Sequence, residues 1–117
     1  MNKFMLVFHS AATDEAAFQE MSPEAIQAEI EKWHTWIQGI AAQGRLTGTD
    51  ALLPTGKTLR GSARMMTDGP YTEGKEIVGG YMILSADSLE EAVELAKGCP
   101  IFETEGTVEV RPIQVFE

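Results

Sequence analysis

The chain has 117 residues, of which 44% are hydrophobic, and its 18 acidic and 9 basic side chains give a formal net charge of -9. This length fits a single domain, residues 1–117, built around one hydrophobic core. The acidic balance and the absence of a Lys/Arg cluster argue against nucleic acid as a partner, because phosphate binding needs a basic face. A single cysteine, Cys99, excludes an internal disulfide and a multi-cysteine zinc site, and we predict that its thiol is a small buried hydrophobe.

The first predicted element is a strand over residues 3–9, a nearly continuous apolar run that is typical of a central strand covered on both faces. The run is too short for a signal peptide or a membrane span, and from this we expect a cytoplasmic, bacterial-type protein with no membrane partner. Residues 10–21 mix small and acidic side chains without a clean period and are predicted to form a loop.

A long helix is predicted to begin at Ser22 and Pro23, because serine is a good N-cap and proline suits the first helical position. Gly44 is the expected C-cap glycine of this helix. The helix has one apolar stripe, which we expect to lie in the core and whose members are Ile26, Ile30, Trp33, Ile37 and Ile40.

Strands alternate with one more helix in the rest of the chain. Residues 45–53 and 57–67 predict two strands joined by the turn Pro54-Thr55-Gly56, and residues 76–84 predict the next strand. Ser88 has capping-box spacing to Glu91, so a second helix is predicted to begin there. It stops before Pro100, and residues 107–116 predict a last strand.

This order of elements predicts an α+β fold, a ferredoxin-like sandwich in which an antiparallel sheet carries two helices on one face and has an added strand. The other sheet face then has no helix to cover it. Met5, Phe8, Tyr81 and Ile83 are side chains of the kind that such a face exposes, although the sequence leaves open which of them lie there. Monomers rarely keep a large exposed apolar patch, so we expect a homodimer formed through the open sheet face.

The most unusual segment spans residues 68–81, where turn formers, charges and a glycine pair are crowded together. Gly69-Pro70 presets a sharp turn, since glycine tolerates positive φ and proline fixes its own φ. Gly79-Gly80, inside a predicted strand, indicates a bulge or the close approach of another backbone or a ligand. The segment is therefore predicted to be a site or a junction.

This segment resembles the DGPF motif of the YCII-related proteins, in the run Asp68-Gly69-Pro70-Tyr71-x-Glu73-x-Lys75-Glu76 and then Gly79-Gly80-Tyr81. Tyr71 stands where the motif usually has phenylalanine. Further matches in order and spacing are Leu89-Glu90-Glu91-Ala92, Cys99-Pro100 and Glu109-Val110-Arg111-Pro112. The resemblance implies a small domain of the dimeric α/β-barrel group, usually a homodimer with facing sheets. Most such proteins are uncharacterised; some accompany extracytoplasmic-function sigma factors, and an enzymatic role has been suggested by structural similarity.

Two side chains are candidates for catalytic proton transfer. Asp68 acts as a general base if it is partly desolvated, although an aspartate here also begins a turn by accepting from its own downstream amides, and we favour the turn. His34 lies beside Trp33 and Trp36, which are placed to wall a pocket, and its plainer alternative is a partly buried, hydrogen-bonded histidine. The histidine–aspartate pair proposed as catalytic in some relatives has no matching motif at either histidine.

Further residues are candidates for ligand binding. Tyr71, Glu73, Lys75 and Glu76 are predicted to hold a polar ligand, with a solvated charge run as the alternative. Arg111 lies two residues from Glu109 on a predicted strand, so the two side chains share a face. Arg111 is a candidate to pair with Glu109, with residues 75–76 or with a substrate carboxylate. Of these, we expect a structural ion pair.

His9, at the end of the first strand, is a further ligand-binding candidate because histidine is a common proton-transfer and ligand-binding residue. Two histidines without ligand spacing give no support to a metal site, and no cofactor fingerprint is present.

Two functions fit these observations. The first is a homodimer that binds a small polar or aromatic molecule between helix and sheet near residues 68–76, with acid-base chemistry that needs no cofactor. The alternative is a non-catalytic regulatory or assembly module, linked to sigma-factor or stress systems, in which the same motif builds the dimer interface. Whether the protein is an enzyme is left open by the sequence.

Overall fold

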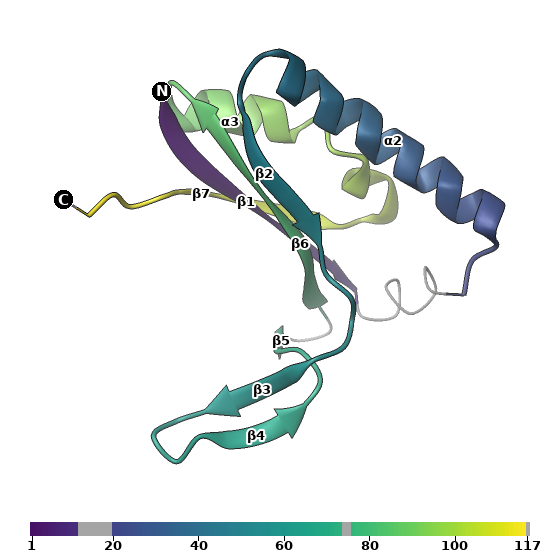
Figure 1. The fold of residues 1–117 in the computed structure, drawn as a ribbon, viewed down its shortest axis with the longest axis vertical. Coiled ribbons are helices and arrows are strands. Elements are labelled where there is room, and N and C mark those ends of the chain that lie inside the picture. Colours follow the sequence, from purple (N-terminus) through teal and green to yellow (C-terminus); the bar gives the residue numbers. More distant parts are fainter. Residues whose placement is uncertain (12–19, 74–75, 117) are drawn as a thin grey trace.

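The computed structural model describes residues 1–11, 20–73 and 76–116 (Figure 1). Its main sheet is antiparallel, with the strand order β2-β6-β1-β7, and the short strand β5 also pairs with β6. The strands of this sheet are β1 (Asn2–Ala11), β2 (Leu46–Ala51), β5 (Thr72–Glu73), β6 (Glu76–Ala86) and β7 (Thr107–Pro112). This is the ferredoxin-like strand order, with β1 central as predicted and β5 as an added strand.

Two helices cover one face of this sheet, and Figure 1 shows both on the same side of it. They are α2 (Pro23–Ala42) and α3 (Leu89–Ala96), and a 3-10 helix, η1 (Pro100–Thr104), follows α3. The predicted α+β, ferredoxin-like fold is therefore confirmed.

The helix ends agree with the capping signals of the sequence. Ser22 caps α2 by accepting a hydrogen bond at Oγ from the Ala25 amide, at 3.2 Å, and Gly44 follows the helix with a φ of +71°. Ser88 accepts in the same way from the amide of Glu91, at 3.2 Å. The Glu91 carboxylate then accepts from the amide of Asp87, also at 3.2 Å, so it caps one residue earlier than an ideal capping box.

Strand alternation decides which side chains reach the helices. In β1, Phe4, Leu6 and Phe8 are buried on the helix side, while Met5, Val7 and His9 lie on the opposite face. Phe8 therefore belongs to the core and not to the open face, where it had been considered. The described helices cover one face of β1 only, so the predicted coverage on both faces is not found among the residues that the structure describes.

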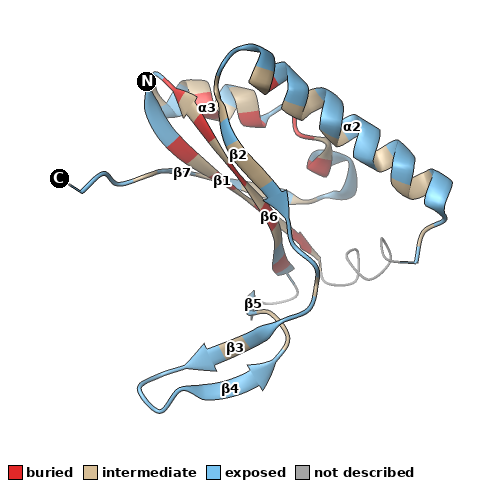
Figure 2. Cartoon of the chain, in the orientation of Figure 1, coloured by how far each residue is buried: buried red, intermediate tan, exposed pale blue. Residues whose placement is uncertain are grey.

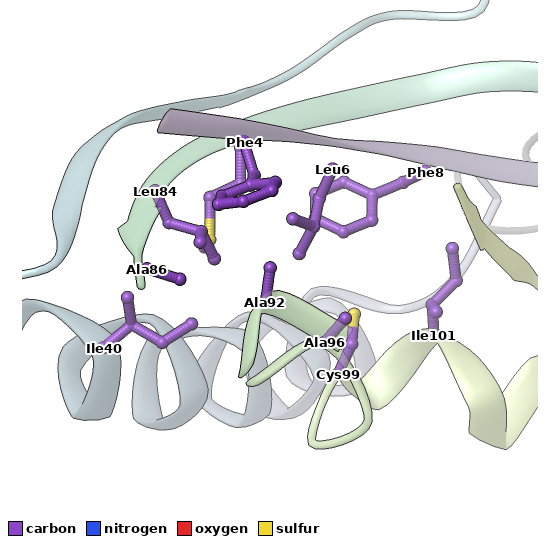
Figure 3. Close-up of a cluster of buried hydrophobic side chains, with 11 residues drawn as sticks. Phe4, Leu6, Phe8, Ile40, Leu84, Ala86, Ala92, Ala96, Cys99 and Ile101 are labelled. Atoms are coloured by element: carbon purple, nitrogen blue, oxygen red, sulfur yellow. The ribbon is translucent and has the colours of Figure 1, made fainter. Parts of the chain in front are cut away.

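The core lies between the sheet and the helices, where side chains from β1 and β6 meet those of α2 and α3 (Figure 3). Within the α2 stripe only Ile40 is buried, at 2% exposure, whereas Ile30 is 40% exposed. The prediction that the whole stripe is core is therefore wrong for its N-terminal part among the described residues. Sequence periodicity locates an apolar face but does not say how far along the helix the sheet extends beneath it.

The glycine pair Gly79-Gly80 forms a bulge and also permits the close approach of another backbone, the two roles that the sequence left open. The pairing of β1 with β6 shifts between Phe8, opposite Gly80, and His9, opposite Val78, which leaves Gly79 as the extra residue of a bulge. A Cβ at Gly80 would lie 2.7 Å from the backbone oxygen of Asp50. The close approach is thus made by strand β2 of the same chain.

The segment between β2 and β6 departs from the predicted hairpin. Strand β2 pairs with β6, and the predicted strand 57–67 is instead two strands, β3 (Lys57–Arg60) and β4 (Met65–Asp68), which form a separate two-stranded sheet. The chain reverses between them near Gly61, at a φ of +68°, and Arg64, at a φ of +55°. We call residues 52–71 the arm; Figure 2 shows it exposed along almost its whole length.

Candidate functional site

The open face of the main sheet has an apolar floor. Met5 lies opposite Ile83 of β6, and Val7 lies opposite Tyr81. The side chains of Met5, Val7 and Ile83 are half-buried although no described helix covers this side. Such a floor is typical of a surface that another molecule covers.

Five polar side chains stand in this floor, and we call them the open-face cluster: His9, Asp50, Tyr81, Glu109 and Arg111. Directly opposite residues in an antiparallel sheet share a face. The register places Asp50 opposite Tyr81, Tyr81 opposite Val7 and Val7 opposite Glu109, so a single row crosses all four long strands. Arg111 lies opposite Met5 in the next row.

At one end of the row, the hydroxyl of Tyr81 donates a hydrogen bond to Oδ2 of Asp50, at 2.6 Å. This hydrogen bond, followed by the negative charge of Asp50 and by burial, raises the pKa of the Tyr81 hydroxyl above its usual 10.0. The phenol therefore stays protonated near neutral pH and holds the carboxylate of Asp50 in place.

At the other end, Glu109 connects two cationic or titratable groups. Its Oε1 lies 3.1 Å from Nε2 of His9 and its Oε2 lies 3.8 Å from Nε of Arg111. Since an ionised carboxylate only accepts hydrogen bonds, Nε2 of His9 is the donor, and Nδ1 is the acceptor of the neutral imidazole. The predicted ion pair between Glu109 and Arg111 is confirmed.

This arrangement has the parts of an acid-base site. A histidine oriented by a carboxylate is a common way to present one ring nitrogen for proton transfer. The Arg111 side chain is 71% exposed, and its contact with Glu109 is long, so its guanidinium is accessible to solvent. It is placed to bind an anionic group beside His9.

The Asp68-Gly69-Pro70 turn closes the base of the arm. The Asp68 carboxylate is 88% exposed and pairs with Lys57 across the two strands. Gly69 has a φ of +87°, its amide donates to Gly56, at 2.7 Å, and its carbonyl accepts from Oγ1 of Thr58, at 3.0 Å. The chain bends at Gly69 as predicted, but the Asp68 carboxylate contacts Lys57 and not the downstream amides that the sequence analysis expected. At 88% exposure it also lacks the desolvation that a general base needs.

Tyr71 follows this turn and is exposed. The Arg60 guanidinium lies over its ring, 5.2 Å from the centroid, in a cation–π contact within the arm. Glu76 begins β6 and is exposed. Lys75 and the side chain of Glu73 lie outside the described part of the chain.

His34 is exposed on α2, which covers the sheet face opposite the open-face cluster. Trp33 and Trp36 do not wall a pocket around it, because both pack edge-to-face against Phe8, at centroid distances of 5.2 and 6.0 Å. Trp36 also donates from Nε1 to the carbonyl of Leu95, at 3.0 Å. The predicted residues that the structure describes thus divide into four places: Asp68 and Tyr71 on the arm, Glu76 at the start of β6, His34 on α2, and His9 with Arg111 on the open face.

The sequence analysis missed the pairing of Asp50 with Tyr81. Both residues lie in predicted strands, but strand 45–53 was paired with 57–67 and not with 76–84. The available signal for this hydrogen bond is a carboxylate in one strand and a tyrosine in another. It becomes informative only when the two strands are known to be neighbours.

Cys99 is buried next to α3, as predicted. Burial raises the pKa of its thiol to about 12. Among the described residues, no group of three His, Cys, Asp or Glu side chains is arranged to hold a metal ion. None of the described helices is both long enough and apolar enough to cross a bilayer.

The fold and its open face define a ferredoxin-like α+β domain with one uncovered sheet face that carries a polar cluster. Residues 4–117 match the family model of the YCII-related domain. The chain therefore belongs to the YCII-related family, as its DGPF-like motif indicated.

Two similar proteins place the chain among known sequences and structures. "Uncharacterized protein R00369" of Rhizobium meliloti (strain 1021) is 34% identical over 79 residues, which are 63% of this chain and 64% of that protein. The match thus spans less than two thirds of the relative's length. A solved structure of 5-chloro-2-hydroxyhydroquinone dehydrochlorinase (TftG) from Burkholderia phenoliruptrix AC1100, in complex with 2,5-dihydroxybenzoquinone, is 16% identical with a TM-score of 0.45, covering 95% of this chain and 93% of the other.

Proposed function

We propose that the protein is a homodimer whose two open sheet faces meet and enclose a binding site for a small polar or aromatic molecule. The observation that carries this proposal is the open-face cluster, whose hydrogen-bonded pairs Asp50–Tyr81 and His9–Glu109 flank the apolar floor on a sheet face that no described helix covers. An apolar floor alone favours a simple dimer seam. The polar row that crosses the floor supplies side-chain groups that can orient a ligand in the enclosed space.

The contacts within the cluster lower the free-energy cost of burying its polar side chains in a dimer. Burying a polar group without a partner costs about 1–3 kcal/mol in proteins. Asp50 and Tyr81 satisfy each other, and Glu109 binds both His9 and Arg111. A second copy can therefore cover the face without leaving these groups unpaired, while the remaining donors of Arg111 favour an acidic or other electron-rich ligand.

Acid-base chemistry without a cofactor is the reaction type that this cluster supports. His9 transfers the proton through Nδ1 while Glu109 holds Nε2 and stabilises the imidazolium that forms. Arg111 binds the negative charge that develops on a substrate oxygen. Asp68 and His34, the earlier candidates, become comparison sites because the structure keeps them away from this cluster.

The test combines the oligomeric state with ligand binding. Sedimentation equilibrium of the wild type measures the dimer, and a thermal-shift screen against small carboxylates and phenols measures binding. A hit is then repeated with His9→Asn and Arg111→Lys, with His34→Asn as the matched control and Asp68→Asn as the arm control. We expect both cluster variants to lose most of the shift, and both controls to keep it.

Three results would count against the proposal. A monomer at about 100 µM removes the enclosed site, since a dimer of useful affinity has a dissociation constant well below that concentration. A hit that survives both cluster substitutions but disappears in Asp68→Asn returns the site to the arm. A dimer that binds no member of the library leaves the open face as a seam, and the regulatory or assembly module becomes the better account.

A further inference from the structure

The arm stands apart from the rest of the described chain. Its two strands pair only with each other and make no substantial packing contact with another described strand or helix. The radius of gyration is 15.6 Å, whereas a compact domain of this length has about 13 Å. The arm is therefore a projecting ribbon and not part of the body.

One face of this ribbon carries an exposed apolar pair beside the Lys57–Asp68 ion pair, while Met65, opposite Arg60, lies on the other face. Leu59 and Met66 lie directly opposite each other across the two strands, and they are 64% and 63% exposed. Leu53, where the arm begins, and Met65, near its tip, are also exposed. An isolated two-stranded hairpin is at best marginally stable in water, so a surface that buries the Leu59–Met66 pair supplies packing that the single chain lacks.

The arm is also basic on an otherwise acidic protein. Residues 52–71 contain three of the chain's 9 basic residues, Lys57, Arg60 and Arg64, but only one of its 18 acidic residues, Asp68. Asp68 pairs with Lys57, and among the described residues no carboxylate forms an ion pair with Arg60 or Arg64. Opposite charge steers association and selects partners, so the acidic body of this same chain is complementary to the arm.

The position of the arm links it to the open face. Figure 1 shows β3 and β4 extending beyond the sheet on the side away from α2 and α3, which is the side of the open-face cluster. A copy that covers the open face therefore comes within reach of the arm. In a contact with two-fold symmetry, each arm meets the other copy in the same way.

We propose that the arm docks on a second copy of this chain, with Leu59 and Met66 buried in the contact and Arg64, in the turn between the two strands, facing carboxylates of that copy. The inference rests on the homodimer of the proposed function and extends it. The open face supplies one part of the interface, and the two arms supply a second part that tightens the dimer and closes the end of the enclosed space.

The first experiment measures the dimer dissociation constant by sedimentation equilibrium. The double variant Leu59→Thr with Met66→Thr keeps the β propensity of the arm and removes its apolar surface. Phe102→Thr is the matched control, because Phe102 is also exposed but lies in η1 on the helix side. We expect the arm variant to weaken the dimer about tenfold or more, as for the loss of apolar contacts at an interface, and the control to stay within about twofold.

A second measurement uses the unmodified protein, so that it does not depend on how the variants fold. Hydrogen exchange of the β3 and β4 amides is followed at protein concentrations above and below the dimer dissociation constant. The proposal expects protection of these amides only in the dimer. Protection that is equal in the monomer shows an arm that needs no partner, and amides that exchange freely in the dimer leave the arm available to another protein. Either result overturns the proposal.

The variant Val7→Lys separates the arm from the open face, since Val7 lies in the middle of the apolar floor. If Val7→Lys dissociates the dimer and the arm variant does not, the arm inference fails and the proposed function stands. If the arm variant dissociates the dimer and Val7→Lys does not, the arm contact stands and the enclosed site fails. A wild type that stays monomeric defeats both.

Discussion

Replacing Gly80 by alanine tests the close packing of β2 against β6. The added Cβ would lie 2.7 Å from the carbonyl oxygen of Asp50 and 3.3 Å from Cα of Ala51. Both atoms belong to backbone, so β2 must move away from β6 and strain the hydrogen bonds between them. Overpacking of this kind costs about 1–3 kcal/mol, and the lower chain entropy of alanine in the unfolded state returns about 0.4–1 kcal/mol.

We therefore expect Gly80→Ala to lower the free energy of unfolding by about 1–2 kcal/mol, and the melting temperature by roughly 4–8 °C. Urea unfolding followed by tryptophan fluorescence measures the change. Gly48→Ala, on β2, and Gly39→Ala, on α2, are the controls, because a Cβ at either position has no atom within 4 Å. Both controls should be at least as stable as the wild type. A Gly80→Ala protein that matches them would refute the argument from strand approach.

Three further outcomes follow from single contacts. Asp50→Asn should lower the pKa of Tyr81 toward 10, because the hydrogen bond to a carboxylate and then its negative charge, which together raise this pKa, are lost. Absorbance at alkaline pH measures the change, and an unchanged titration contradicts the assignment. With a pKa of about 12, the Cys99 thiol is about one thousandth ionised at pH 9. A thiol reagent should therefore react with Cys99 far more slowly in the native protein than in the urea-unfolded protein. Equal rates would show an accessible thiolate. Ser88→Ala removes the cap of α3 and should cost about 0.5–2 kcal/mol of stability in urea unfolding; no change would mean that the cap is replaced.

Much of the fold was predictable because its signals are local. Ser22, Gly44 and Ser88 mark helix ends through the backbone groups that a helix leaves unpaired. The apolar run of residues 3–9 and the later strand and helix patterns place the elements in ferredoxin-like order. Gly69 has the positive φ that favours glycine, and the pair Gly79-Gly80 marks a bulge and a close approach of β2 that leaves no room for a Cβ at Gly80.

The prediction of two long strands in 45–53 and 57–67 failed for a physical reason. A strand pattern shows that a segment is extended but not which neighbour it pairs with, and short connections make the sequential hairpin the natural expectation. In this chain β2 instead gains a long partner in β6, where Gly80 lets the two backbones come close. The residues between them are left to pair among themselves as the arm.

The candidate site depended even more on tertiary structure. His9 and Arg111 were recognised individually, but period-two alternation does not say which face is covered by helices. The sheet register brings Glu109 beside His9 from 100 residues away and Tyr81 beside Asp50 from 31 residues away.

The sequence by itself determined the class of fold, the helix caps and the turn at Gly69, because each follows from neighbouring residues, and it left the glycine pair open between a bulge and a close approach. The tertiary structure decided the strand partners, the burial of the two tryptophans and the composition of the open face, because these depend on contacts between distant segments. It also turned the segment of residues 68–81 from one candidate site into two parts, the base of the arm and the strand that carries Tyr81.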